Sequence, residues 1–165
     1  MTAVTERPVR PVPRPLIRTF WAVHRFLFRI TGGRFGLKRP VAGKTFGMLR
    51  LETVGRRTGK RREAMIGYYE DGPNLVTMAM NGWGQSEPAW WVNLQARSVA
   101  TVTLPDGRRE VRARIAAGPE RDRLWAGFER YPGWGDNLDG LAALRARETT
   151  VIVLEPRSAE QTTKS

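Results

Sequence analysis

The stretch MLRLETVGRRTGKRREAMIGYYEDGPNLVTMAM, residues 48–80, alternates apolar and polar side chains and is interrupted by two turn sequences. The first turn is Gly55–Lys60, and the second is Asp71-Gly72-Pro73-Asn74, whose composition is typical of a tight reversal. The three strands that this pattern predicts are Met48–Val54, Glu63–Tyr69 and Leu75–Met80. Strands joined by such short turns pair as antiparallel neighbours, so the stretch predicts an antiparallel sheet.

The rest of the chain continues the pattern with hairpin-linked strands and short helices. Pro88 is expected in the first turn of a helix, where its missing N–H costs nothing. The further strands are expected at Val99–Leu104, Arg109–Ala117 and Thr149–Leu154, and the helices at Ala89–Ala96, at Pro119–Tyr131 and within 132–147. Six strands linked in this way favour closure into a barrel, and the alternating βαβ order of a doubly wound fold is absent. The sequence therefore predicts an α+β fold around a mostly antiparallel barrel at 45–157.

The N-terminal 44 residues are of a different kind. Residues 1–15 are rich in proline and arginine, which predicts a disordered tail, as does the polar composition of 158–165. Residues 16–31 place apolar side chains on one helical face and arginines on the other, and a basic loop follows as far as Lys44. This amphipathic helix could dock on an anionic membrane surface, line a binding cleft, or pack on the domain.

Composition excludes several kinds of chemistry. The 165-residue chain has no cysteine and a single histidine, His24. Disulfides, iron–sulfur ligation, thiol catalysis and a His- or Cys-based zinc site are therefore excluded. The net charge of +12 favours a polyanionic partner, such as nucleic acid, anionic lipid or a phosphorylated cofactor, although an arginine-rich genome would give the same excess. No apolar run is long enough to span a bilayer and no secretory signal is visible, so we expect a cytoplasmic protein.

The first turn, Gly55-Arg56-Arg57-Thr58-Gly59-Lys60-Arg61-Arg62, carries five basic side chains. Glycines that allow tight backbone turns, together with converging guanidinium groups, suit phosphate or carboxylate ligands. The spacing does not fit a nucleotide-binding P-loop, because three residues rather than four separate the glycines and a strand follows instead of a helix. A solvated hairpin without a ligand would explain the same residues.

Aromatic side chains gather in two later segments. Trp83, Trp90 and Trp91 fall within nine residues, and Trp90 shares a helix face with Asn93 and Leu94. These rings could wall a flat ring system, or they could be ordinary core. Tyr131-Pro132-Gly133-Trp134 forms the second segment, whose hydroxyl and indole could close the mouth of a cleft.

Three of these segments together resemble the deazaflavin-dependent nitroreductases. The basic turn is similar to their G-R-(K/R)-(S/T)-G-x-x-R element. Pro88–Ala96 is similar to their P-x-W-x-x-N-L-x-A helix, and Tyr131-Pro132 is similar to their Y-P element. The order and spacing agree over roughly residues 45–155, most of the chain.

The resemblance implies a split β-barrel that binds coenzyme F420, a 5-deazaflavin whose phosphate and oligoglutamate tail are both anionic. It implies hydride transfer from the reduced deazaflavin to a quinone, an enone or a nitro compound, with Tyr131 as the proton donor. The implied cofactor-binding residues are Arg56, Arg57, Thr58, Lys60, Arg62, Met65, Ile66, Met80, Asn81, Gly82, Trp83, Trp90 and Asn93. Among these, the basic side chains would hold the phosphate or tail, and the backbone of 64–67 would run beside the ring.

Two other functions fit parts of the sequence. A split-barrel protein that binds FMN or haem would share the fold. A non-enzymatic protein that binds membrane or nucleic acid through its basic N-terminus would explain the charge, but no RNA-recognition or helix-turn-helix signature supports nucleic acid, which we do not expect as a partner. The expected partners are a small-molecule electron acceptor and, through residues 16–31, an anionic membrane surface. The chain could be a monomer or a homodimer.

Overall fold

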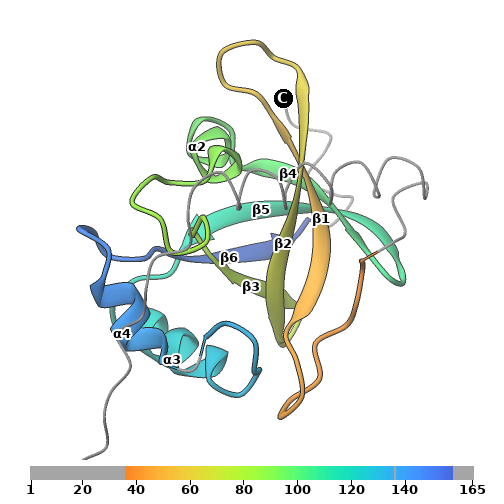
Figure 1. Cartoon of the computed structure of the whole chain (residues 1–165). Helices are drawn as coiled ribbons and strands as arrows, with labels where there is room; N and C mark the ends of the chain where they lie inside the picture. Colours follow the sequence, from red (N-terminus) through yellow and green to blue (C-terminus); the bar gives the residue numbers. More distant parts are fainter. Residues whose placement is uncertain (1–35, 136, 158–165) are drawn as a thin grey trace, which may run out of the picture. The chain divides into compact units, whose positions relative to one another are not determined.

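The computed structural model describes residues 36–135 and 137–157 (Figure 1). The chain divides into two compact units, 1–35 and 36–165, and only the second contains described residues. The predicted helix at 16–31 and the predicted tails at 1–15 and 158–165 lie outside the described residues. In the described part of the chain, no helix is both long and apolar enough to cross a membrane.

The described residues form a closed antiparallel barrel of six strands, with the order β1-β2-β3-β6-β5-β4. The strands are β1 (Gly47–Val54), β2 (Arg61–Asp71), β3 (Asn74–Met78), β4 (Val99–Leu104), β5 (Gly107–Ile115) and β6 (Val151–Pro156). The strands β1 and β2 pair without interruption, from Gly47 opposite Tyr68 to Val54 opposite Arg61. The predicted α+β class and the mostly antiparallel barrel of about six strands are confirmed.

Every second side chain along the strands points into the barrel, and together these side chains form an interior core. Leu49 and Leu51 of β1 face inward with Ile66 and Tyr68 of β2, and all four are buried. The helix α2 (Ala89–Ala96) adds Trp90, Trp91 and Leu94 to the same core. Burial of an aromatic or aliphatic side chain of this size stabilises a fold by about 1.5–3 kcal/mol, so α2 is held mainly by these contacts.

A second core lies on the outer face of the barrel. The helices α3 (Gly118–Phe128) and α4 (Leu138–Ala143) lie close together at this face (Figure 1). Its strand residues are Tyr69, Val76, Met78, Val151 and Val153, and they pack against Leu124, Phe128, Trp134 and Leu138. The end of β2 therefore belongs to a different core from its middle.

Several predicted boundaries were wrong by one to three residues. The strand β3 ends at Met78 rather than Met80, because the ladder with β6 ends there. The helix α3 ends at Phe128 rather than Tyr131, and the Tyr131 N–H bonds to the Phe128 carbonyl, 3.0 Å away, in a tighter turn. Pro88 is the N-cap residue of α2 rather than its first helical residue.

The remaining shifts follow from strand pairing. The strand β2 extends to Arg61–Asp71 because its first residues pair with the end of β1 and its last with β3. The strand β5 spans Gly107–Ile115 rather than 109–117, since Gly107 pairs with Leu104. The strand β6 spans Val151–Pro156 rather than 149–154.

Candidate functional site

The basic turn between β1 and β2 is closed by its own backbone. The Gly55 N–H donates to the Lys60 carbonyl and the Gly59 N–H donates to the Gly55 carbonyl, each at 2.8 Å. Gly59 has a φ of 65°, which a residue with a side chain adopts only at a cost. The turn therefore keeps its shape without using its basic side chains.

Those basic side chains are exposed and uncompensated. Within the described residues, no ion pair involves Arg56, Arg57, Lys60 or Arg62, and all four are exposed. Arg61 differs, because its guanidinium lies 3.7 Å from the carboxylate of Glu52. Four free cations on one rigid turn fit a ligand with a phosphate or several carboxylates.

Asn93 ties this turn to α2. Its Oδ1 accepts the Arg56 N–H at 3.1 Å, and its Nδ2 donates to the Thr53 hydroxyl at 3.1 Å. The side chain is only 9 % exposed, so both bonds are shielded from water. A buried amide with both ends satisfied fixes the two elements relative to one another.

The strand β2 leaves part of one backbone edge open. Its residues 61–68 pair with β1, but pairing with β3 is confined to Tyr69–Asp71. The Gly67 carbonyl points away from β1, since it accepts a bond from the Thr77 hydroxyl at 2.8 Å. Because backbone groups alternate along an antiparallel strand, those of Met65 and Glu63 point the same way. These donors and acceptors have no strand partner among the described residues.

Trp134 lies over the face of β2 at Gly67, beside this open edge. A Cβ added at Gly67 would come within 2.6 Å of Cη2 of Trp134, so the indole lies directly on the Gly67 backbone. The Trp134 ring also packs on Phe46, with centroids 4.6 Å apart. Its Nε1 is buried and has no hydrogen-bond partner in the described part of the structure.

The segment Met80–Trp83 approaches the same place from β3. The Nε1 of Trp83 donates to the Trp134 carbonyl at 3.3 Å, and Trp83 has a φ of 60°, an uncommon conformation for a large side chain. Met80 and Trp83 pack partly buried against the outer core, while Asn81 and Gly82 are exposed. The structure thus brings this predicted segment next to Trp134.

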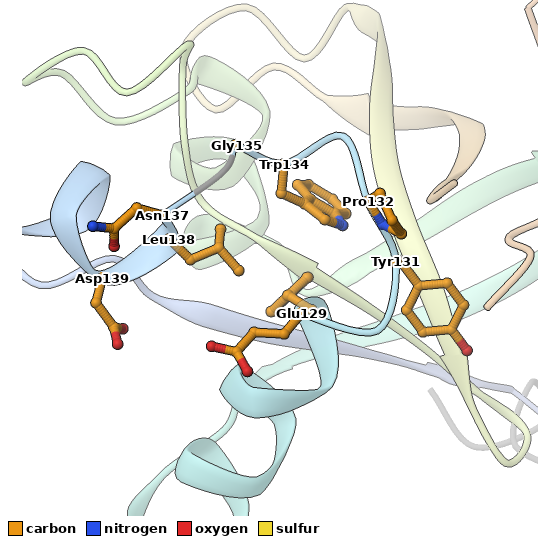
Figure 2. Close-up of a pocket in the computed structure, with 9 residues that line it drawn as sticks. Glu129, Tyr131, Pro132, Trp134, Gly135, Asn137, Leu138 and Asp139 are labelled. Atoms are coloured by element: carbon orange, nitrogen blue, oxygen red, sulfur yellow. The ribbon is translucent and has the colours of Figure 1, made fainter. Parts of the chain in front are cut away.

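Trp134 also lines a pocket of about 390 Å³ (Figure 2). It is lined by Phe128, Glu129, Tyr131, Pro132, Trp134, Gly135, Asn137, Leu138 and Asp139. One carboxylate is engaged, because Asp139 accepts the Trp125 Nε1–H at 2.8 Å. The volume suits a ligand of a few fused or substituted rings.

Tyr131 lies at the edge of this pocket. Its ring stacks on Tyr69, with centroids 5.2 Å apart and planes 15° apart. Figure 2 shows its hydroxyl directed away from Asn137 and Asp139, and this hydroxyl has no hydrogen bond to the described residues. The Tyr69 hydroxyl, by contrast, donates to the Leu124 carbonyl at 2.7 Å, and burial raises the pKa of Tyr69. Tyr131 is therefore the more available of the two hydroxyls.

The predicted site residues thus fall into three groups. The basic residues of the turn and Thr58 are exposed beside Asn93. Met65 is buried on β2, and Met80–Trp83 lie near Trp134. Ile66 and Trp90 belong to the interior core, where their side chains support the strand and the helix that carry the site.

Sequence reasoning missed part of the pocket. Glu129, Asn137, Leu138 and Asp139 line it, but none stands in a motif that carried the resemblance. The only available signal was their position directly around the Tyr-Pro element. The pocket depends on how α3 and α4 fold back on the barrel, which no local pattern gives.

Comparison with known proteins identifies the family. A family model described as F420H2-dependent quinone reductase matches residues 22–156. The chain belongs to this family. The Mycobacterium tuberculosis protein Rv3178, which is named as an F420H2-dependent quinone reductase, is 32 % identical over 123 residues, covering 74 % of this chain and 96 % of that protein.

Two solved structures share the fold. One, described as a domain-swapped dimer, has a TM-score of 0.60 at 24 % identity and covers 86 % of this chain and 99 % of that chain. The other, the F420H2-dependent reductase FDR-A, has a TM-score of 0.57 at 24 % identity and covers 66 % of this chain and 93 % of that chain.

Family membership makes this chain an F420-dependent oxidoreductase. The predicted family, enzyme class and cofactor are confirmed. The four uncompensated cations of the turn fit the anionic part of that cofactor.

Proposed function

We propose that this chain reduces a quinone with a hydride from reduced coenzyme F420. The observation that carries the proposal is the place of Trp134, which lies on Gly67 at the open edge of β2 and also lines the 390 Å³ pocket. One side chain thus contacts both the strand proposed to carry the ring and the cavity proposed to take the acceptor. When bound, the reduced deazaflavin supplies two electrons as a hydride.

The basic turn and β2 would hold the cofactor. Arg56, Arg57, Lys60 and Arg62 would bind its phosphate and the start of its tail, with Thr58 adding a hydroxyl on the same turn. The open backbone groups of Met65, with the segment Met80–Trp83 opposite, would hold the ring. This division is supported by charge at one end of β2 and by unpaired backbone groups at its middle.

The pocket beside Trp134 would take the quinone. Phe128, Trp134 and Leu138 give the pocket apolar walls for a ring, and Glu129, Asn137 and Asp139 add polar groups. Reduction of a quinone to a hydroquinone requires two protons and two electrons, so one hydride must be accompanied by one proton. We propose that the Tyr131 hydroxyl delivers this proton, because the residue lines the pocket and its hydroxyl has no hydrogen bond to the described residues. The hydroxyl points away from Asn137 and Asp139, so proton delivery requires the side chain to turn toward the quinone.

We further propose a cytoplasmic enzyme whose basic segment 16–31 associates with an anionic membrane surface. The charge pattern of that segment supports the proposal. Membrane association would concentrate the enzyme near lipid-soluble quinones. The domain boundaries predicted from sequence and the choice between monomer and homodimer stay predictions.

The first test is equilibrium binding followed by turnover. Quenching of tryptophan fluorescence should report tighter binding of F420 than of FMN, since six tryptophans include Trp83 and Trp134 beside the proposed ring site. Oxidation of F420H2 by a soluble naphthoquinone should then be measurable as a change in absorbance at 420 nm. Binding without quinone turnover would refute the acceptor assignment, and preference for FMN would refute the cofactor role of the basic turn.

A further inference from the structure

The chain segment 79–87 leaves the barrel at the end of β3 and carries Met80–Trp83, the residues proposed to hold the ring. Part of it is strained, since Trp83 has a φ of 60°. A bulky residue keeps such a backbone conformation only where the surrounding structure fixes it. We therefore expect contacts from elsewhere in the chain to hold this segment.

Arg145 holds the start of the segment from the connection between α4 and β6. Its Nη1 donates to the Ala79 carbonyl and to the Thr149 hydroxyl, each at 2.9 Å. The Ala79 N–H donates to the Thr150 carbonyl, also at 2.9 Å. Both backbone groups of Ala79 are thus fixed at the point where the segment leaves β3.

Gln85 holds the other end of the segment to the same connection. Its Nε2 donates to the Leu144 carbonyl and its Oε1 accepts the Ala146 N–H, each at 2.8 Å. Leu144 and Ala146 are the two sequence neighbours of Arg145, so the amide of Gln85 brackets the backbone of the arginine. Arg145 and Gln85 together form a clamp on the segment that carries Met80–Trp83.

The charge of Arg145 is buried without a carboxylate partner. The residue is 6 % exposed, and its Nε is buried with no hydrogen-bond partner in the described part of the structure. Arg145 makes no ion pair within residues 36–135 and 137–157, and the carboxylate of Glu87 lies 3.6 Å from Arg147 instead. Burial lowers the pKa of Arg145, and the charge of Arg147 lowers it further. A buried cation that bonds only to neutral oxygens costs stability, which favours a role in fixing position over a role in stabilising the fold.

We propose that Arg145 is a positioning residue that holds Met80–Trp83 in place for coenzyme F420. The inference rests on the proposed role of this segment in holding the ring. Arg145 is buried and does not line the acceptor pocket, so it acts through the Ala79 carbonyl rather than by touching a ligand. A segment that is already ordered binds its ligand more tightly, because less ordering remains to be done on binding.

The test replaces Arg145 in two ways. Arg145→Met removes both bonds from Nη1 and keeps a long side chain, so F420 binding should weaken about 10-fold as the released segment has to be ordered on binding. The kcat at saturating F420H2 should change little, because the bound cofactor restores the segment. Arg145→Lys should bind F420 nearly as well as the unchanged protein, since one ammonium group can donate to both oxygens that Nη1 reaches. Fluorescence titration gives Kd, and steady-state oxidation of F420H2 gives kcat.

Two further variants separate position from stability. Arg114→Met makes the same chemical change where the guanidinium bonds to Glu120 at 2.7 Å and to Glu155 at 2.6 Å, so it should lower the unfolding temperature and leave the Kd of F420 unchanged. Gln85→Ala removes the exposed half of the clamp and should weaken F420 binding about 3-fold. Because Gln85→Ala leaves the buried residues untouched, it tests the clamp even if Arg145→Met does not fold.

The results that contradict the inference differ from those that contradict the proposed function. An unchanged Kd in Arg145→Met and Gln85→Ala would overturn the inference and leave the cofactor role intact. Equal weakening in Arg145→Lys and Arg145→Met would show that the two bonds from Nη1 do not position the segment, and equal weakening in Arg114→Met would show an effect of stability alone. Absence of F420 binding by the unchanged protein would refute the proposed function and this inference with it.

Discussion

The two ends of β2 are built in opposite ways. At Arg61 the strand leaves an exposed turn whose four uncompensated basic side chains face solvent. At Tyr69 it is enclosed by Phe128 and Tyr131, with ring centroids 4.9 and 5.2 Å away. The eight residue steps from Arg61 to Tyr69 span about 26 Å of extended chain.

The difference lies in what holds each end in shape. The turn is fixed by backbone hydrogen bonds and by Asn93, so its charged side chains stay free for a ligand. The aromatic end is fixed by its own side chains, which leave a pocket beside them. Cofactor affinity should therefore depend on one end and acceptor reduction on the other, and variants can test that separation.

Tyr131→Phe should have the largest effect on turnover. It keeps the ring that stacks on Tyr69 but removes the unbonded hydroxyl, so kcat should fall about 100-fold, the lower range for a lost general acid. The Kd of F420 should stay unchanged, because the cofactor would be held at the other end of β2. Stopped-flow oxidation of F420H2, with Kd from fluorescence, measures both.

A structural role for Tyr131 would give a different result. Loss of packing would lower the unfolding temperature and raise the KM for the quinone, with little change in the pH dependence of kcat. Unchanged kcat in the Phe variant would remove Tyr131 as the proton donor.

The double variant Arg57→Ala/Arg62→Ala should weaken F420 binding about 30-fold, since each exposed charge-assisted contact contributes about 1 kcal/mol. The KM for the quinone at saturating F420H2 should not change. A control that also removes two positive charges is Lys44→Ala/Arg112→Ala, because both side chains are exposed and outside the proposed site. Equal weakening in the control would indicate net charge rather than the turn.

The two ends also differ in how far sequence alone could predict them. The basic turn is local: its glycines, cations and flanking strands lie within 33 residues, so the strand pairing could be predicted. The anion site at the turn stays a prediction. Likewise the helix Ala89–Ala96 and the strand Val99–Leu104 begin and end where they were expected. Local periodicity and a proline cap determine these elements.

The aromatic pocket could not be predicted in the same way. Trp134 rests on Gly67, which precedes it by 67 positions, and the glycine was not recognised as the place where an indole would lie. Asn93 was expected among the cofactor-binding residues, but its bond to the Arg56 N–H depends on the turn folding back over α2.

Asn93→Ala should lower both the stability of the fold and the affinity for F420. It leaves the Arg56 N–H and the Thr53 hydroxyl without a partner, at a cost of about 1–3 kcal/mol in the free energy of unfolding. Because the turn loses the Asn93 side-chain bond that ties it to α2, F420 binding should also weaken about 5-fold, whereas the KM for the quinone should not change. Chemical denaturation and fluorescence titration measure these, with the exposed neighbour Gln95→Ala as the control.

If Asn93→Ala lowered stability but left F420 affinity intact, the turn would be held by its own backbone alone. If both values were unchanged, the shielded amide would have no bracing role. Either result would contradict the assignment of Asn93 as a positioning residue for the cationic end.

Lowering the pH should give the smallest effect of these tests. It should change the unfolding temperature through a group at the aromatic end of β2 only. Asp71 ends β2, and both its oxygens accept bonds from the Arg123 guanidinium, at 2.9 and 3.0 Å, which lowers the Asp71 pKa below its ordinary value of 3.8. A carboxyl whose pKa is lowered by folding stabilises the fold above the unfolded-state pKa, and this contribution is lost as the pH falls through the folded-state value. The unfolding temperature should therefore fall slightly more below pH 4 in the unchanged protein than in Asp71→Asn, which lacks the ionised carboxylate at every pH. F420 binding at neutral pH should be the same in both, because the pair lies at the far end of β2 from the turn. A loss of F420 affinity in Asp71→Asn would show instead that the two ends are coupled through the strand.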